Sequence, residues 1–148
     1  MTKENSMFLG EYEYRVDSKG RLPLPPKFRQ ELGLEMILTK GVETCVIGYP
    51  LAEWHRVANG LTAKTIASES LRMLNRQMFS SAYPASLDGQ GRTALPTKLR
   101  QHAQIEDTAI VVGANNYFEI WDPKLWEQAK TSAEEKAHQI IESLEGQQ

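Results

Sequence analysis

The chain has 148 residues, is 41% hydrophobic and carries a net charge of −2, which fits one globular domain or two fused half-domains. No apolar run approaches the ~20 residues of a membrane span and no signal-peptide pattern opens the chain, so we expect a cytoplasmic protein with no membrane partner. The average charge conceals an asymmetry: residues 119–148 are net −4 and residues 1–118 are net +2.

The first expected element is a half-buried strand at residues 11–16, where polar and apolar side chains alternate. Residues 17–20, Asp-Ser-Lys-Gly, have the composition of a tight hairpin turn. The aspartate can accept hydrogen bonds from the amides that follow it, and the glycine can adopt a positive φ. Arg21 begins the return strand, in which Leu22 and Leu24 are expected to face inward.

Pro25 and Pro26 end that strand and suit the first turn of a short helix, which Gly33 terminates. The remaining elements of this unit are strands at residues 36–39 and 45–49 and a helix over residues 51–61.

The same order of elements is expected again in the second half, because the chain contains an internal repeat. Residues 17–30 (DSKGRLPLPPKFRQ) and 88–101 (DGQGRTALPTKLRQ) match at eight of fourteen positions with a constant offset of 71. One copy is too short to bury much surface alone, so we expect two copies related by a pseudo-two-fold axis to share one core. In the second copy, Asp122 is expected to cap the last helix, with Pro123 at its first position.

Two further helical segments lie outside the repeat. Residues 68–82 predict a linking helix whose apolar face serves either the core or a subunit contact. Residues 129–144 are amphipathic and are expected to extend the last helix beyond the repeated body, with residues 146–148 frayed. The expected organisation is a first repeat at 7–66, the linking helix at 67–82, a second repeat at 83–130 and a helical tail at 131–148.

Positive charge gathers on the repeated motif, since residues 18–30 and 89–105 contain basic side chains and no acidic ones. The arginine after each turn glycine can reach phosphate oxygens or the acceptor atoms of guanine in a major groove. The candidates for DNA contact are Arg21, Arg92, Lys19, Arg15, Lys27, Arg29, Lys98 and Arg100. The candidates for locking the two turns are Asp17, Gly20, Asp88 and Gly91.

Each of these functional assignments has a structural alternative. Arg21 and Arg92 could instead form ion pairs with the turn aspartates, and the bases of the short helices could simply be solvated. The aspartates themselves are expected to lock the turns, because a carboxylate beside a phosphate is repulsive. The tryptophans follow apolar spacing and are expected in the core rather than as stacking platforms for bases; they are Trp54, Trp121 and Trp126.

The sequence lacks the groupings that catalysis or metal binding requires. Cys45 lies in an apolar, strand-like run and is expected to be a buried, unreactive thiol. The three histidines stand apart from any Cys or Glu at ligand spacing. We therefore expect no enzyme activity, no catalytic residues, no cofactor, no metal and no small-molecule substrate.

The paired motifs resemble those of the MraZ family, bacterial regulators of the division and cell-wall gene cluster. The resemblance begins at Met7-Phe8-Leu9-Gly10, includes the Asp-x-x-x-Arg signatures at 17–21 and 88–92, and runs to the helix of Trp126. It implies an α+β fold of two tandem swapped-hairpin β-barrel half-domains, akin to AbrB and SpoVT domains, with flanking helices. Whether the hairpins pair within one chain or between chains stays open.

The resemblance also implies a transcriptional regulator of the nucleoid, mainly a repressor of its own operon, that binds double-stranded DNA at direct promoter repeats as a ring-shaped homo-oligomer. The DNA-contacting arginines of the family correspond to Arg21 and Arg92. The second copy has Gly89-Gln90 where the first has Ser18-Lys19, so equal contact by both copies is left open. The alternative is an oligomeric scaffold or interaction module without specific DNA readout.

Overall fold

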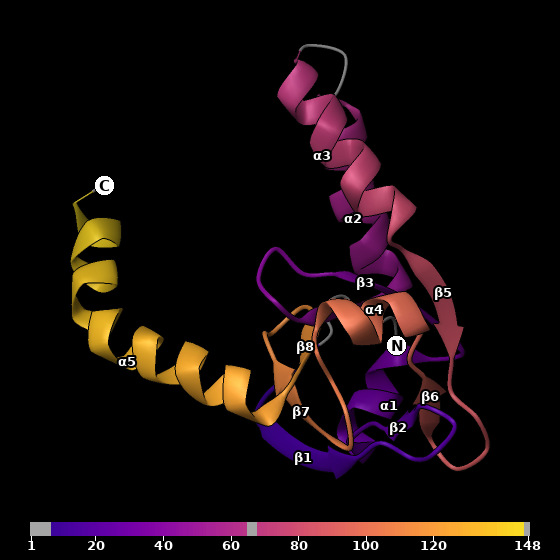
Figure 1. The fold of residues 1–148 in the computed structure, drawn as a ribbon. Helices are drawn as coiled ribbons and strands as arrows, with labels where there is room; N and C mark the ends of the chain where they lie inside the picture. Colours follow the sequence, from indigo (N-terminus) through magenta and orange to yellow (C-terminus); the bar gives the residue numbers. More distant parts are fainter. Residues whose placement is uncertain (1–6, 65–67, 147–148) are drawn as a thin grey trace.

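The computed structural model describes residues 7–64 and 68–146, and within them it shows a six-stranded antiparallel sheet, a two-stranded ribbon and five helices (Figure 1). The expected boundary between residues 66 and 67, the residues before Met7 and the end of the fraying tail at 147–148 lie outside the described residues.

The elements agree with the predicted ranges to within two residues. The strands are β1 (Glu11–Arg15), β2 (Arg21–Pro23), β3 (Glu35–Lys40), β4 (Val46–Pro50), β5 (Tyr83–Ser86), β6 (Arg92–Ala94), β7 (Thr108–Gly113) and β8 (Phe118–Trp121). The helices are α1 (Pro26–Leu32), α2 (Leu51–Thr62), α3 (Glu69–Ser80), α4 (Thr97–His102) and α5 (Pro123–Glu145). The predicted tail and the helix of Trp126 are therefore one continuous helix, α5.

The two copies exchange their first strands. In the sheet order β1-β7-β8-β4-β3-β5, β1 of the first copy pairs with β7 of the second, and β5 of the second copy pairs with β3 of the first. The predicted turn forms, since the Asp17 amide donates to the Arg21 carbonyl at 3.0 Å. The prediction of a simple hairpin between these two strands is wrong, however, because β2 pairs with β6 instead of β1. The exchange takes place within one chain.

Equivalent residues of the two copies face each other at two places. The β2–β6 ladder is centred on Leu22 opposite Thr93, which are 71 positions apart, as the repeat is. The β4–β8 ladder is centred on Ile47 opposite Glu119, which occupy matching positions in the fourth strand of each copy. Self-pairing of equivalent positions requires a local two-fold axis there, so both ladders mark the pseudo-symmetry that the repeat predicted.

One apolar core serves both copies, as expected. It is enclosed by the inner face of the sheet, the β2–β6 ribbon, α1 and α4. Three buried rings lie at its centre: the centroid of Phe8 is 5.1 Å from that of Phe28 and 5.5 Å from that of Phe118. Gly48 makes room for this cluster, because a Cβ at that position would overlap the Phe118 ring.

The tryptophans pack between elements, but only Trp121 is buried in the core as predicted, since Trp54 and Trp126 are half-buried. The ring of Trp54 on α2 is 5.5 Å from that of Phe79 on α3, so it holds these two helices side by side. Trp121 is 5% exposed. The indole of Trp126 on α5 donates to the Glu11 carboxylate of β1 at 2.9 Å.

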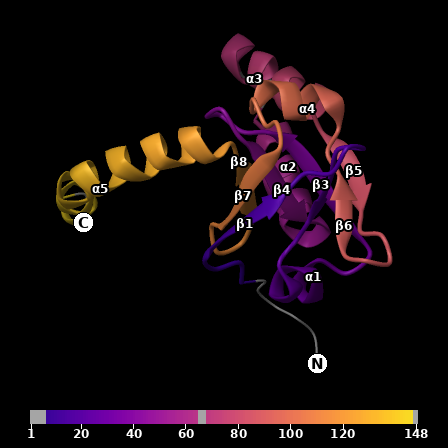
Figure 2. The same cartoon turned by 60° about the horizontal axis from the view of Figure 1, so that its bottom comes forward.

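The helices leave the sheet in different directions. In Figure 2, α3 rises from one end of the body while α5 extends away from it on another side. Asp122 caps α5 as predicted, since its carboxylate accepts hydrogen bonds from the Lys124 and Leu125 amides at 3.1 Å each. Within residues 7–64 and 68–146, no helix is both long and apolar enough to cross a membrane.

Candidate nucleic-acid interface

The two signature turns have the same hydrogen-bond pattern. The Asp17 carboxylate accepts from the backbone amides two and four residues later at 2.9 Å, and from the Arg21 Nε at 2.7 Å. The Asp88 carboxylate accepts from the two corresponding amides at 2.9 Å, and from the Arg92 Nε at 2.9 Å. Each aspartate therefore folds its turn and holds the arginine that ends it.

The hydrogen bond that the Arg21 amide donates to the Asp17 carboxylate is the largest of the interactions that lower the pKa of Asp17 to about 2. The corresponding bond from the Arg92 amide lowers the pKa of Asp88. Both carboxylates are therefore ionised at neutral pH, as locking a turn with an arginine requires.

The turn glycines connect the two copies. Gly20 and Gly91 have φ values of +78° and +75°, which residues with a Cβ rarely adopt. The Gly20 carbonyl accepts from the Leu95 amide at 2.9 Å, and the Gly91 carbonyl accepts from the Leu24 amide at 3.1 Å. The turn of each copy is thus hydrogen-bonded to the residue that follows the return strand of the other copy.

The ribbon places Arg21 and Arg92 on one outward face. Arg21 pairs with the residue two positions after Arg92, and Arg92 pairs with the residue two positions after Arg21. Leu22 and Thr93 lie between them in the two strands and are buried on the opposite face of the ribbon. The Arg92 Nη1 lies 3.7 Å from the Asp17 carboxylate, so the two turns also touch through side chains. The ion pairs of the structural alternative are therefore present, yet the side chains stay 35% and 23% exposed.

Arg29 and Arg100 have a different position from the other candidate bases. Both are half-buried, and each donates from Nε to a backbone carbonyl of its own copy at 3.1 Å. The Arg29 guanidinium occupies the space where Gly91 would carry a Cβ, and the Arg100 Nη1 lies 3.3 Å from the corresponding point at Gly20. These two arginines support the turn of the opposite copy, a role that the sequence analysis missed. The offset of 71 shows that Arg29 and Arg100 are equivalent, as Gly20 and Gly91 are, but it does not show that each arginine contacts the glycine of the opposite copy.

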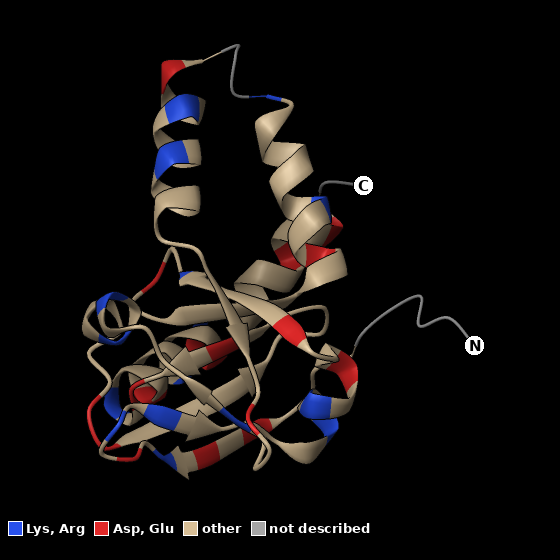
Figure 3. Ribbon diagram, turned by 90° about the vertical axis from the view of Figure 1, so that its right-hand side faces the viewer, with Lys and Arg blue, Asp and Glu red and all other residues tan. Residues whose placement is uncertain are grey.

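The remaining candidates are exposed around the ribbon. Lys19 lies within the first turn, Arg15 ends β1, and Lys27 and Lys98 lie at the starts of α1 and α4. Figure 3 shows basic segments interleaved with acidic ones over this part of the body. The ribbon is therefore the place where basic side chains of both copies are brought together, and acidic strand residues border it.

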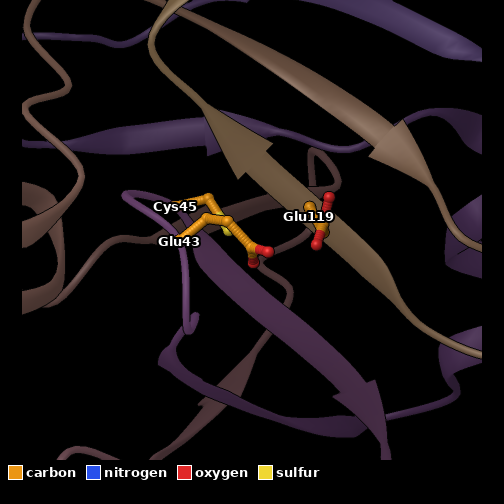
Figure 4. A group of neighbouring side chains, drawn as sticks. All are labelled: Glu43, Cys45 and Glu119. Atoms are coloured by element: carbon orange, nitrogen blue, oxygen red, sulfur yellow. The ribbon is translucent and has the colours of Figure 1, made fainter. Parts of the chain in front are cut away.

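Away from the ribbon, the fold gathers Glu43, Cys45 and Glu119, whose ligand atoms all lie within 4.8 Å of one another (Figure 4). Burial raises the pKa of the Cys45 thiol far above its usual range, and burial also raises the pKa of Glu119. The thiol is buried as predicted. Glu43 precedes it in the same loop, but the approach of Glu119 was not foreseen because that residue lies on β8.

Sequence comparisons agree with this geometry. The family model described as "MraZ protein, putative antitoxin-like" matches residues 7–77 and again residues 78–144. A protein named "Transcriptional regulator MraZ" from Dehalococcoides mccartyi strain 195 is 46% identical over 141 residues, which cover 95% of this chain and 99% of that protein.

A protein of the same name from Roseiflexus castenholzii is 39% identical over 138 residues, covering 93% of this chain and 96% of its own length. Each of the two matched ranges contains one signature turn and one of the exchanged strands. With two tandem copies and relatives matched over nearly their whole length, the chain belongs to the MraZ family.

Proposed function

We propose that this chain is a DNA-binding transcriptional regulator that contacts double-stranded DNA through the outward face of the β2–β6 ribbon. The name that the curated relatives carry supports regulation of transcription. The observation that carries the proposal is the register of the ribbon, which gives Arg21 and Arg92 a common face. The protein acts on the bacterial nucleoid in the cytoplasm and needs no catalytic group.

The ion pairs with the aspartates are compatible with DNA contact. Each is made through Nε, the guanidinium nitrogen nearest the backbone, so it fixes the plane of the group while the Nη atoms lie further out. An oriented guanidinium is suited to a bidentate contact with guanine or phosphate. Lys19, Lys27 and Lys98 then serve as phosphate contacts that position the protein without reading sequence.

The two turns contribute unequally in this proposal. The first turn carries Lys19, whereas the matching residue of the second turn is Gln90. Loss of one phosphate contact lowers the salt dependence of binding by about 0.9 in the slope of log K against log salt. Substituting Lys19 with Gln should therefore make the first turn resemble the second in its salt response.

We further propose that several chains form a ring that binds tandem repeats in the promoter of its own operon, a division and cell-wall gene cluster, and represses it. One chain presents few positive charges, so a single contact is weak and sensitive to salt. A ring makes each later contact intramolecular and raises the overall affinity. Equal affinity for one repeat and for three or four repeats would contradict this part of the proposal.

Fluorescence anisotropy on a duplex from the chain's own upstream region tests the DNA contact. Each bidentate contact contributes about 1–3 kcal/mol, so Arg21→Ala with Arg92→Ala should weaken binding about 30-fold or more. Lys64→Ala, an exposed base at the end of α2, is the matched control and should bind like the unaltered chain. Undiminished binding by the double variant, with its oligomeric state intact, would favour the scaffold alternative.

A further inference from the structure

The distal half of α5 carries an apolar stripe that faces water. Figure 1 shows this helix running away from the sheet, and Ile140, Ile141 and Leu144 are 51%, 54% and 62% exposed. With Ala133 and Ala137 they recur at three- and four-residue spacing, so they share one face. Most helical stability in proteins comes from packing such a face, which indicates that this stripe is covered in the working assembly.

A groove of about 440 Å³ lies at the other end of the molecule, between α3 and the loop that joins β3 to β4. Its floor is the outer face of the sheet at Ile47 and Tyr49, and Leu74 and Met78 of α3 form one wall. The loop residue Val42 borders it and is 93% exposed. An apolar groove with one helical wall suits the apolar face of a helix.

Charge decides between the two ways of covering the α5 stripe. Residues 131–146 contain four glutamates and one lysine, so pairing two tails would bring like charges together. The groove instead carries Lys40 and no acidic residue among the described residues of its lining, while the arginines of α3 lie on the helix face opposite the lining residues Leu74 and Met78. An acidic helix is attracted to this groove and repelled by its own copy.

We propose that the apolar stripe of α5 in one chain docks into the α3 groove of a second copy. The inference deepens the assembly part of the proposed function and rests on it. A tail can reach the groove of a neighbour, whereas within one chain α5 and α3 point away from the body in different directions. Each chain therefore offers one tail and one groove, and such a head-to-tail contact builds a closed ring when the rotation between copies closes.

Sedimentation velocity on the full chain tests the contact. Leu74→Glu in the groove and Ile140→Glu in the tail should each raise the dissociation constant about 30-fold or more and yield monomers. The controls are the neighbouring Met73→Glu, which is outside the groove lining, and Gln139→Glu, which is on the opposite face of α5. Both controls should assemble like the unaltered chain.

Mixing the two variants distinguishes the docking mode. Each retains one intact surface, so an equimolar mixture should form a complex of one chain of each kind and stop there. Assembly by Leu74→Glu alone, or a mixture that stays monomeric, would overturn the inference. Val42→Glu repeats the groove test at a highly exposed position, where the substitution leaves folding intact. If the unaltered chain is monomeric at all concentrations, the proposed ring is overturned as well. Failure of the proposed DNA contact would instead appear only in the DNA binding of the arginine variants.

Discussion

Asp17 does more than close a local turn. Its carboxylate accepts bonds from two amides and from Arg21, and it also lies within 3.7 Å of the Arg92 guanidinium of the second copy. A single ionised side chain therefore links the outward faces of both turns. The bonds from the Arg21 amide, the Arg21 side chain and the Lys19 amide favour the charged form and hold the pKa of Asp17 low.

The ionisation of Asp17 gives a pH prediction. A carboxyl whose pKa is about 2 in the folded protein and 3.8 in the unfolded chain contributes stability at neutral pH. That contribution is complete above the unfolded value and is lost as the pH falls from 3.8 through about 2. A carbon-13 titration should place the Asp17 midpoint near 2.

Asp17→Asn supplies the control for this titration. It keeps an oxygen that accepts from the amides and removes the charge, so it should be less stable than the unaltered chain at pH 7. The difference in urea midpoint should shrink as the pH falls below 3.8. A difference that is constant across this range would show that ionisation is not what the turn uses.

Gly91 allows a second test at the level of one atom. Its φ of +75° and the Arg29 guanidinium against it both exclude a Cβ, so Gly91→Ala should lower the free energy of unfolding by about 1–3 kcal/mol. Gly89→Ala in the same turn is the control, because nothing lies within 4 Å of its added Cβ. Urea unfolding of both variants measures the difference, and equal midpoints would contradict the expectation.

At the scale of elements, local patterns predicted where helices and strands begin and end. The alternation of residues 11–16, the prolines before α1 and the aspartate before α5 each act through nearby backbone groups, so the sequence alone reveals them. Strand partners depend on contacts between distant segments, and for that reason the hairpin at residues 17–20 was assigned the wrong pair of strands. The support of each turn by Arg29 or Arg100 was missed for the same reason.

The cap of α5 yields a prediction about an element. Asp122→Ala removes the acceptor of two amide hydrogen bonds and should cost about 1 kcal/mol, whereas Asp122→Asn retains an acceptor and should cost only a few tenths. Circular dichroism during thermal unfolding compares the two. If Asn proves as damaging as Ala, the charge of the aspartate rather than its hydrogen bonds stabilises the start of the helix.

At the scale of the molecule, the shared core joins the copies into one cooperative body. Residues from both copies meet in the same cluster, and the six-stranded sheet contains β1, β3 and β4 of the first copy and β5, β7 and β8 of the second. Neither copy can lose its packing while the other keeps its own. Folding should therefore be a single transition rather than two successive ones.

Tryptophan fluorescence can test this cooperativity from each half separately. Trp54 reports on the first copy, and Trp121 with Trp126 reports on the second. A variant with Trp54→Phe and a variant with Trp121→Phe and Trp126→Phe isolate the two signals. Within each variant, the fluorescence midpoint in urea should coincide with the midpoint from circular dichroism, and separate midpoints would mean that the copies unfold independently.

The exchange of first strands between the two copies also constrains the evolution of this protein. Deleting either copy would strip the survivor of an edge of its sheet, since β1 completes the second copy and β5 completes the first. A protein reduced to one unit would lack that edge strand unless a second chain supplied it. The residues of the two copies are then free to diverge, as Lys19 and Gln90 have, without either unit becoming dispensable.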